Sequence, residues 1–390
     1  MDITSLDNRK KIAIVVVGYN RLSSIKRLLQ SLDKANYPSD DIPLVISIDA
    51  SGDEDLYNYV RNYKWEHGDL FVFIREERLG LKNHIFACAD LTRYFRAVIL
   101  LEDDLFVSPY FYDYVNSCLE FYDNEGKVAC IGLYSYTSNI YAALPFVPYQ
   151  GEYDVYGIQA TITWGECWNT RMWSDFRRWM SANPDIDWEH LDIPQNVKAF
   201  KRAWSKYFTA YLSTTDRFVV APYKSYTTNF SEAGEHRDFV DTCVQVPIVR
   251  RHELLKFGHI DAIQKYDSYF NPLGLEYYLG VDKSNLYVDL YSLRANIRNC
   301  RYLLSTDILP YKCIRSYALM MKPMEVNIYE NITGEGLYFY DLTQKDSSIK
   351  VNVNPLQSIV YRLQMFRPLL LKKFLVDYIK QLVLNKLKLK

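Results

Sequence analysis

An apolar run that ends in three consecutive carboxylates constrains the fold of this chain more than any other feature. Residues 97–101 are all apolar, and Glu102, Asp103 and Asp104 follow them directly. Such a run is typical of a strand buried on both faces of a parallel sheet. Ligands of open α/β sheets bind beyond the carboxyl ends of the strands, so these acids would face a binding crevice and suit Mg²⁺ or Mn²⁺. An acidic turn that only closes a strand is the alternative interpretation of the triplet.

The residues around the triplet predict an alternation of strands and helices. Continuous apolar runs rich in β-branched side chains predict strands at 12–17, 44–48, 71–74 and 97–101. Apolar residues at helical spacing predict helices over 25–32 and 83–95. Strands that alternate with helices favour right-handed crossovers and a doubly wound layer structure. The predicted fold class is therefore α/β, a Rossmann-like sheet followed by a smaller carboxyl-terminal region.

Several short motifs follow one another through about the first three fifths of the chain. They are Val17 to Arg21, Ile48-Asp49, Val98 to Leu105, Ser108 to Phe111, Trp164-Gly165 and Asn229 to His236. In this order they resemble glycosyltransferases of the GT-A type, in particular the inverting family-2 enzymes and the N-acetylglucosaminyltransferase I group. The resemblance implies a nucleotide-sugar-binding domain that works with Mn²⁺ or Mg²⁺.

The resemblance also implies roles for the triplet. Asp104 would ligate the metal ion, while Glu102 and Asp103 would face the ribose and the hydroxyls of the donor sugar. Carboxylates accept paired hydrogen bonds from vicinal diols, which suits them to sugars. A metal ion that bridges the phosphates would stabilise the charge of the departing nucleoside diphosphate.

Four further residues are implied to contact the nucleotide sugar. Gly18 and Arg21 follow the first strand, and Arg21 would lie near the base or the diphosphate; its alternative is a solvated residue in the first helical turn. Asp49 would accept the N3 proton of a uracil, or else form a turn or cap. His236 resembles the histidine of a closing loop that touches metal or phosphate, and a surface position is the alternative.

The base that would activate the acceptor hydroxyl has no direct counterpart in this sequence. In the N-acetylglucosaminyltransferase I group it is an aspartate at a helix start, but the matching segment Trp204 to Tyr207 has no carboxylate. Glu166 is the preferred substitute, predicted to border the acceptor cleft with a pKa raised by aromatic neighbours. An acid in the first turn of a helix is its alternative, and Asp238 and Glu235 are further candidates. Trp164 could stack on a sugar ring, whereas the other tryptophans of this stretch are expected to pack in the core.

Composition limits the partners and the compartment. The chain has 46 basic and 47 acidic residues, which argues against a nucleic-acid partner. Its seven cysteines include no CxxC pair, so we expect a reducing compartment and no structural zinc site. No signal peptide and no apolar run of membrane-spanning length are found, so the expected location is cytoplasmic.

The rest of the chain is divided by composition. Residues 1–245 are expected to form the GT-A domain, 246–345 an accessory region with a β-hairpin over 324–341, and 346–390 a basic amphipathic helical tail. From Tyr361 onward the tail has eight basic residues and only Asp377 as an acid, among many leucines. This pattern favours a helix on an anionic membrane surface, on the inner face of the plasma membrane, or else a helix packed against the protein.

The sequence therefore predicts a metal-dependent inverting glycosyltransferase, a hexosyl- or N-acetylhexosaminyltransferase of polysaccharide biosynthesis. Its donor would be a nucleotide sugar, UDP-linked in the first instance, and its acceptor a carbohydrate or lipid-linked glycan. A nucleotidyltransferase is the enzymatic alternative and would release pyrophosphate. A catalytically inactive sugar-binding or scaffold protein on the same fold is the other alternative and would bind donor without turnover.

Overall fold

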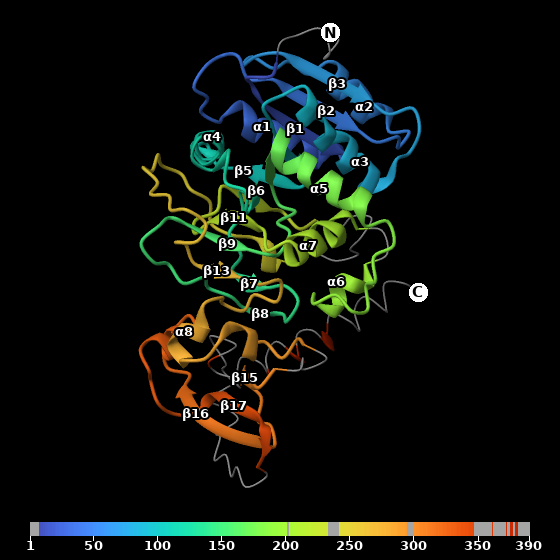
Figure 1. Cartoon of the computed structure of the whole chain (residues 1–390). Coiled ribbons are helices and arrows are strands. Elements are labelled where there is room, and N and C mark those ends of the chain that lie inside the picture. The colour runs from blue at the N-terminus through green and yellow to red at the C-terminus, as the bar shows by residue number, and fades with distance from the viewer. Residues whose placement is uncertain are drawn as a thin grey trace.

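The computed structural model describes residues 8–200, 203–232, 242–294 and 300–346, together with Tyr361, Lys372, Leu375, Val376, Ile379 and Lys380. A nine-stranded sheet forms the body of the molecule (Figure 1), in the strand order β13-β9-β11-β6-β10-β4-β1-β2-β3. Its strands are β1 (Ile12–Gly18), β2 (Leu44–Ile48), β3 (Leu70–Ile74), β4 (Ala97–Glu102), β6 (Val128–Gly132), β9 (Val155–Ile158), β10 (Glu166–Asn169), β11 (Phe218–Pro222) and β13 (Lys265–Tyr266).

The four strands predicted from apolar runs form the parallel part of this sheet. β4, β1, β2 and β3 pair in parallel, with Val17 opposite Glu102 and Gly18 opposite Ile48. β1 and β2 are buried along their whole length, as expected for strands covered on both faces. The carboxyl ends of β1, β2 and β4 therefore meet at one edge, and the predicted α/β architecture is confirmed.

The helices cover this sheet. They are α1 (Leu22–Asp33), α2 (Glu54–Arg61), α3 (Gly80–Ala89), α4 (Phe111–Tyr122), α5 (Thr170–Ala182), α6 (Gln195–Ala199) and α7 (Trp204–Thr214). α3 and α5 both contact α7, and they pack on β1 and β6 respectively. The helix predicted over 83–95 instead begins at Gly80, ends at Ala89 and continues as a short 3₁₀ turn over Asp90–Arg93.

The other half of the sheet is mixed. β10 runs antiparallel to both β4 and β6, with Glu166 opposite Leu100 and Gly132. Gly165 makes the turn before β10 with φ +103°, a left-handed conformation that favours glycine. β13 pairs with β9 at the edge of this half. Two separate two-stranded sheets lie outside it: β5 (Leu105–Val107) with β12 (Thr227–Asn229), and β7 (Ser138–Asn139) with β8 (Leu144–Pro145).

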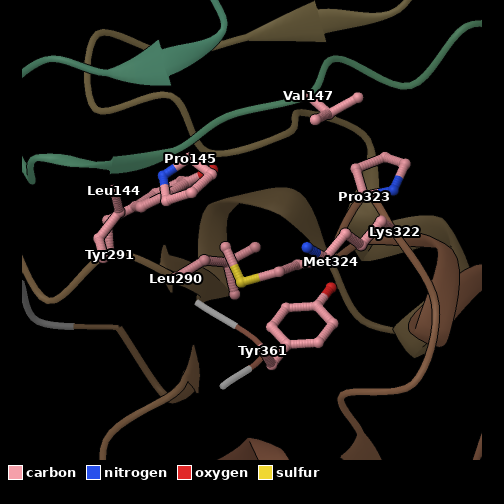
Figure 2. A pocket seen from close by; sticks show the side chains of 9 residues that line it. All are labelled: Leu144, Pro145, Val147, Leu290, Tyr291, Lys322, Pro323, Met324 and Tyr361. Atoms are coloured by element: carbon pink, nitrogen blue, oxygen red, sulfur yellow. The ribbon is translucent and has the colours of Figure 1, made fainter. Parts of the chain in front are cut away.

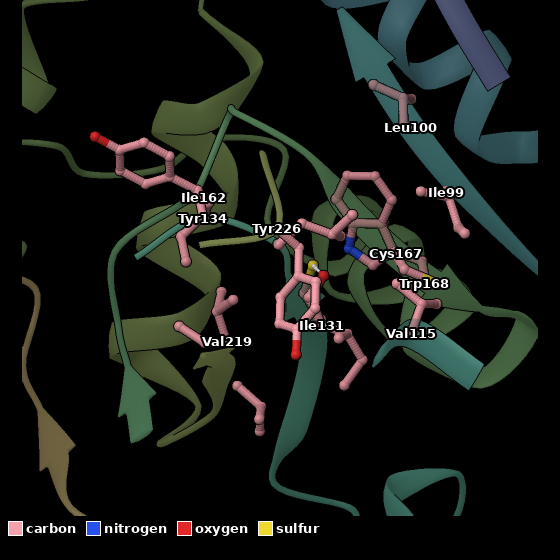
Figure 3. Packing of buried hydrophobic residues seen from close by; sticks show 14 of the residues in the cluster. Ile99, Leu100, Val115, Ile131, Tyr134, Ile162, Cys167, Trp168, Val219 and Tyr226 are labelled. Carbon is pink, nitrogen blue, oxygen red and sulfur yellow. Dashed lines mark hydrogen bonds between the residues drawn. The ribbon is translucent and has the colours of Figure 1, made fainter. Parts of the chain in front are cut away.

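Aromatic side chains fill the core between β10 and the helices. Trp168 is fully buried, and its ring lies 5.2 Å from that of Trp173 and 5.8 Å from that of Trp204. Figure 3 shows Trp168 and Cys167 beside Ile99 of β4. These three tryptophans are packing residues, as the sequence predicted for all but Trp164.

A second, smaller sheet follows the large one and lies at the opposite end of the molecule from β1 to β3 (Figure 1). Its order is β14-β15-β17-β16, made of β14 (Leu286–Asp289), β15 (Tyr302–Ser305), β16 (Tyr311–Ala318) and β17 (Gly336–Lys345). Two short helices, α8 (Leu275–Leu279) and α9 (Val326–Tyr329), pack beside it. The large sheet thus extends to Tyr266, beyond the boundary expected at residue 245. The β-hairpin expected over 324–341 is wrong in its first half, because Val326–Tyr329 form α9, whereas β17 begins at Gly336 in its second half.

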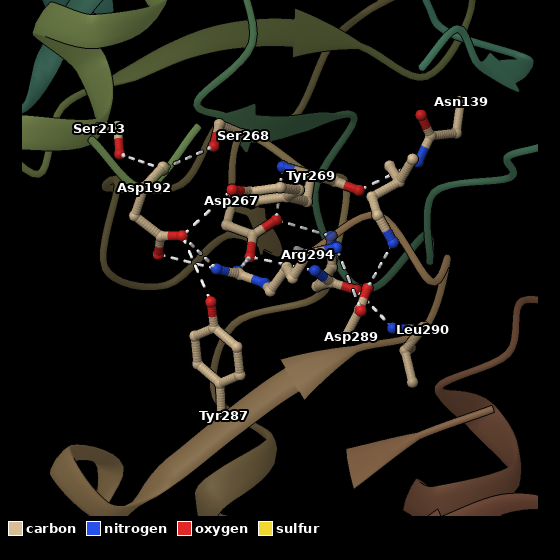
Figure 4. Close-up of polar contacts among 12 residues, drawn as sticks. Asn139, Asp192, Ser213, Asp267, Ser268, Tyr269, Tyr287, Asp289, Leu290 and Arg294 are labelled. Atoms are coloured by element: carbon tan, nitrogen blue, oxygen red, sulfur yellow. Dashed lines mark hydrogen bonds and ion pairs between the residues drawn. The ribbon is translucent and has the colours of Figure 1, made fainter. Parts of the chain in front are cut away.

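Arg294 contacts residues next to the large sheet as well as one residue of the small sheet. Its guanidinium pairs with Asp192 at 2.7 Å and with Asp267, and lies 4.0 Å and 4.4 Å from the ring centres of Tyr269 and Tyr287. Figure 4 shows this cluster, in which Asp267 directly follows β13 of the large sheet, whereas Tyr287 lies on β14 of the small sheet. The Arg294 side chain is only 7% exposed, although the cluster also borders a surface pocket, so most of its contacts are with the protein itself.

The amphipathic tail expected over 346–390 lies mostly outside the described residues. Tyr361 is described, and its hydroxyl donates to the carbonyl of Met321 at 2.6 Å. Figure 2 shows its ring beside Met324 and Leu290 in a small pocket of about 40 Å³. Within the described part of the chain, no helix has the length and apolar character needed to cross a membrane.

Candidate active site

A cavity of about 330 Å³ opens at the carboxyl ends of β1, β2 and β4. Seven residues predicted from the sequence line it: Gly18, Arg21, Asp49, Glu102, Asp103, Asp104 and Trp164. Parallel strands present their carboxyl ends at the same edge, which is why residues so distant in sequence meet here. His236, Asp238 and Glu235 lie outside the described residues, and Glu166 is not part of the cavity wall.

Arg21 holds two of the three carboxylates. It is the residue before α1, and its Nη1 donates to Asp104 Oδ2 at 3.2 Å while its Nη2 donates to Asp103 Oδ1. Burial lowers the pKa of Arg21, but the charges of Asp103 and Asp104 outweigh this effect and raise it. Burial raises the pKa of Asp103 to about 6, against the opposing charge of Arg21. A quarter of the Arg21 side chain is exposed, so the guanidinium remains open to the cavity.

Asn229 orients Asp104 from the opposite side. Its Nδ2 donates to Asp104 Oδ1 at 3.0 Å, and the backbone N–H of Phe230 donates to the Asp104 carbonyl at 2.9 Å. The pairing of β12 with β5 places Asn229 opposite Leu105 and so brings it next to Asp104. The sequence marked Asn229 only as the start of a weak motif.

The donor set at Asp104 fits a metal ion that is shared with a substrate. Among the described residues, no group of three or more histidine, cysteine and acidic side chains is arranged to hold a metal. Each Asp104 oxygen accepts one of the two bonds above, which leaves a lone pair on each for a cation. Mg²⁺ usually needs only one or two protein carboxylates when phosphates complete its shell. These residues therefore suit a cation that arrives with a diphosphate.

Asp49 holds the beginning of α3. Its Oδ1 accepts the backbone N–H groups of Ala50 and Leu79 at 3.0 and 2.8 Å, and its Oδ2 accepts that of Gly80 at 2.9 Å. The side chain is buried, yet it lines the cavity. In this structure Asp49 therefore makes the contacts of a turn and cap residue. One lone pair of its Oδ2 remains available to accept a hydrogen bond from a ligand.

Three residues that the sequence did not reveal complete this side of the cavity. The guanidinium of Arg78 lies 4.7 Å from the ring centre of Tyr19, and both line the cavity. His84 also lines it and shares a hydrogen bond of 2.8 Å with Ser47. Burial lowers the pKa of His84 to about 4, so its imidazole is neutral at pH 7. A flat, partly apolar wall of this kind suits a planar base.

Glu166 lies inside the sheet and not at the acceptor cleft as predicted. It is 1% exposed, and its Oε1 has no hydrogen-bond partner. Because Glu166 is paired with Leu100, it shares a sheet face with Glu102. Burial, and then the charge of Glu102, raises the pKa of Glu166 well above its ordinary value. A carboxyl that is enclosed in the sheet and lines no part of the cavity does not favour the predicted base role.

Glu102 is half-buried, as is Asp104. It lies between the open cavity and the enclosed Glu166. Burial, followed by the charges of Asp104 and Asp103, raises its pKa to about 8. Trp164 forms part of the wall across the cavity, with its ring 4.6 Å from that of Tyr134. Glu232 also lines the cavity, but it accepts a hydrogen bond from Ser24 at 2.6 Å and pairs with Arg27. Among the described residues, the cavity thus combines an acidic floor, the two arginines Arg21 and Arg78, and an aromatic wall.

No family model and no curated protein matches the chain. Solved structures do match. Staphylococcus aureus TarS 1-349 in complex with UDP-GlcNAc is 15% identical with TM-score 0.38, over 58% of this chain and 60% of that chain. The mannosyltransferase PcManGT from Pyrobaculum calidifontis with GDP-Man and Mn²⁺ is 11% identical with TM-score 0.35, over 55% of each chain. GalNAc-T7 with UDP, GalNAc and Mn²⁺ is 14% identical with TM-score 0.37, over 56% of this chain and 43% of that chain. The match spans less than two thirds of each of these proteins.

Proposed function

We propose that this chain is a glycosyltransferase that moves a sugar from a nucleoside-diphosphate donor, in the first instance UDP-linked, to a hydroxyl of a carbohydrate or lipid-linked glycan. The observation that carries this proposal is the meeting of Glu102, Asp103, Asp104 and Arg21 in one cavity at the carboxyl edge of the sheet. The bound nucleotides of the three matched structures are properties of those proteins. They suggest which donors to test first.

The cavity offers a separate environment to each part of such a donor. The wall of Tyr19 and Arg78 would take the base, with Asp49 at its edge. Arg21 would bind the diphosphate, because a guanidinium suits phosphate oxygens and this one faces the cavity. Glu102 and Asp103 would accept hydrogen bonds from the ribose and sugar hydroxyls. Asp104 would hold Mn²⁺ or Mg²⁺, with Asn229 fixing its carboxylate.

The chemistry of transfer follows from this arrangement. A divalent cation at Asp104 would act as a Lewis acid toward the departing diphosphate. Arg21 adds a second positive charge on the same side, where negative charge grows as the glycosidic bond breaks. Inversion also needs a base across the sugar ring from the leaving group. Glu166 is buried in the sheet and lines no part of the cavity, so it is not placed to accept that proton.

Donor hydrolysis without an acceptor tests the proposal directly. Nucleotide sugars are incubated with the protein and Mn²⁺, and the products are separated. Free nucleoside diphosphate supports a glycosyltransferase, whereas pyrophosphate identifies the nucleotidyltransferase alternative. Binding without any product identifies the inactive sugar-binding alternative. Asp104→Asn should abolish the reaction, while Asp185→Asn, an exposed acid elsewhere, should leave it unchanged.

The tail extends the proposal to a membrane-bound acceptor. The described tail residues Leu375, Val376 and Ile379 are helical and 60%, 43% and 51% exposed, and Lys372 and Lys380 flank them. Apolar residues on a basic helix suit an anionic membrane surface, here the inner face of the plasma membrane. Liposome flotation of the full chain and of a truncation after Leu356 measures this contact. Equal soluble fractions of the two proteins would exclude it.

A further inference from the structure

A groove of about 500 Å³ lies beside the candidate active site and is lined by a different set of side chains. Its floor is the segment 246–249, which is apolar and held in place by backbone hydrogen bonds. The N–H of Val249 donates to the Ser225 carbonyl at 2.9 Å, and the Val249 carbonyl accepts the Ser108 hydroxyl at 2.6 Å. The groove therefore has a fixed floor, of the kind that a binding site needs.

The groove and the donor cavity share a wall. Val244 lines the cavity and Val246 lines the groove, two residues further along the chain. Tyr134 stands between them, because its ring contacts Trp164 of the cavity and its hydroxyl donates to the Val244 carbonyl at 3.1 Å. Ser135, the next residue, lines the groove. A molecule in the groove would thus lie against the same wall that faces the donor sugar.

The rim of the groove is basic. Its lining residues include three cations, Lys224, Arg250 and Arg251, but only one acid, Glu253. Lys224 and Arg251 both pair with the same Glu253 oxygen, at 2.8 and 3.3 Å. One carboxylate cannot balance three cations, so a net positive charge remains. The whole chain has nearly equal numbers of basic and acidic residues, so this excess is local.

Arg250 packs against β5, outside the residues that line the donor cavity. Its guanidinium lies 5.5 Å from the ring centre of Phe106, which is two residues after Asp104 on β5. Two arginines and a lysine that converge on one groove suit a phosphate group, since guanidinium groups bind phosphate in a bidentate manner. The apolar floor suits the carbon skeleton that bears the phosphate.

We propose that this groove binds the acceptor and that the acceptor carries phosphate groups, either as a soluble glycan or polyol phosphate or as a lipid-linked one. This inference rests on the proposed function, because it names the acceptor class of the same transfer reaction. The phosphate lies between Arg250 and Arg251, and the acceptor hydroxyl reaches over Tyr134 toward the donor sugar. Transfer joins that hydroxyl oxygen to the anomeric carbon, and the hydroxyl proton and the nucleoside diphosphate leave.

The test compares the acceptor KM of two double variants, one that reverses charges in the groove and one that reverses charges elsewhere on the surface. The variant is Arg250→Glu with Arg251→Glu, and the control is Arg9→Glu with Lys10→Glu, two exposed residues before the amino end of β1 and therefore remote from its carboxyl end. The groove variant should raise the KM for a phosphate-bearing acceptor at least about tenfold, with little change in kcat, because charge-assisted hydrogen bonds are lost. Donor hydrolysis without acceptor, and the KM for a neutral sugar acceptor, should not change.

Two acceptor series separate the sources of phosphate. Glycerol phosphate and sugar phosphates test soluble acceptors, and vesicles with phosphatidylglycerol test lipid-borne ones. An unchanged KM for every phosphate-bearing acceptor, or an equal rise for neutral ones, would overturn the inference. If the wild-type protein hydrolyses no donor, the proposed function fails on its own. Calorimetry with inorganic phosphate and pyrophosphate then still tests the groove, since only the Arg250/Arg251 variant should lose binding.

Discussion

Two clusters of arginine and aspartate in this molecule have the same chemistry but different surroundings. Arg294 pairs with Asp192 and Asp267, and its guanidinium lies 4.0 and 4.4 Å from the ring centres of Tyr269 and Tyr287. Its side chain is only 7% exposed, although Arg294 and its two acids also line a pocket of their own. Arg21 pairs with Asp103 and Asp104, and its side chain is 25% exposed in the cavity of about 330 Å³. We call the first the closed cluster and the second the open cluster. The tighter packing of Arg294 favours a role in stability and the greater exposure of Arg21 a role in binding, and substitutions should separate these two effects.

The largest expected effect is at the open cluster. Asp104→Ala should lower the rate of donor hydrolysis at least about 1000-fold, because it removes the proposed metal ligand. Stability should change little, because Asp104 is partly exposed and Arg21 keeps Asp103 as a partner. Product release and urea unfolding are measured on the same preparation, with Asp185→Ala as the control. A loss of stability as large as that expected for Arg294→Ala would contradict the comparison.

The closed cluster should respond in the opposite way. Arg294→Ala leaves the carboxylates of Asp192 and Asp267 without their partner and should lower the free energy of unfolding by about 3 to 4 kcal/mol. Arg178→Ala, which breaks an exposed pair with Asp175, should cost less than about 1 kcal/mol. Urea unfolding measures both. The fraction of the Arg294 variant that stays folded should bind UDP as tightly as the wild type, and weakened binding would show that this cluster also serves the ligand.

Acid should lower the stability of the folded protein through His84, a residue in the wall of the cavity. Its pKa is about 4 in the folded protein against 6.5 for an ordinary histidine, so the unfolded chain takes up the proton first. This contribution to stability is complete above pH 6.5, falls as the pH drops, and has lost about 3 kcal/mol near pH 4. His84→Gln should therefore lose less stability between pH 6.5 and pH 4 than the wild type. Parallel unfolding curves of the two proteins across this range would show that His84 is not buried in neutral form.

The smallest expected effect is a conservative change of the open arginine. Arg21→Lys keeps the charge but loses the forked geometry that reaches two carboxylates and a phosphate. Donor KM should rise about tenfold, with a change in stability of less than about 1 kcal/mol. Steady-state hydrolysis kinetics and urea unfolding measure the two quantities. An unchanged KM would remove Arg21 from the diphosphate site.

The sequence revealed the open cluster because its residues stand at the ends of apolar runs. Such runs identify buried parallel strands, and the carboxyl edge of those strands is a general binding place. The acidic triplet was found in this way, whereas the roles of Gly18, Arg21 and Asp49 at the ends of the first two strands were implied by the resemblance to GT-A glycosyltransferases. Asn229, Arg78 and His84 were not found, because long-range pairing, such as that of β12 with β5, brings them to the cavity.

The errors have physical causes too. Glu166 was expected at the cleft because it follows a β-rich run, at a place where a strand would turn into a helix. Instead it begins the antiparallel β10, which lies between β4 and β6 and encloses it, and local sequence does not give that register. The β-hairpin predicted over 324–341 failed at residues 326–328, because a run of three residues fits a single helical turn as well as a strand. The Arg294 cluster was missed because its partners are 27 and 102 residues away in the chain.

Calorimetric titration of UDP-GlcNAc and other nucleotide sugars, with and without Mn²⁺, tests the central claim most directly. The open cluster should bind at least one of them in a manner that requires the cation, and Asp104→Asn should lose this dependence while Asp185→Asn keeps it. If the folded wild-type protein binds neither the cation nor any nucleotide sugar, the cavity at the carboxyl edge of the sheet is not a donor site.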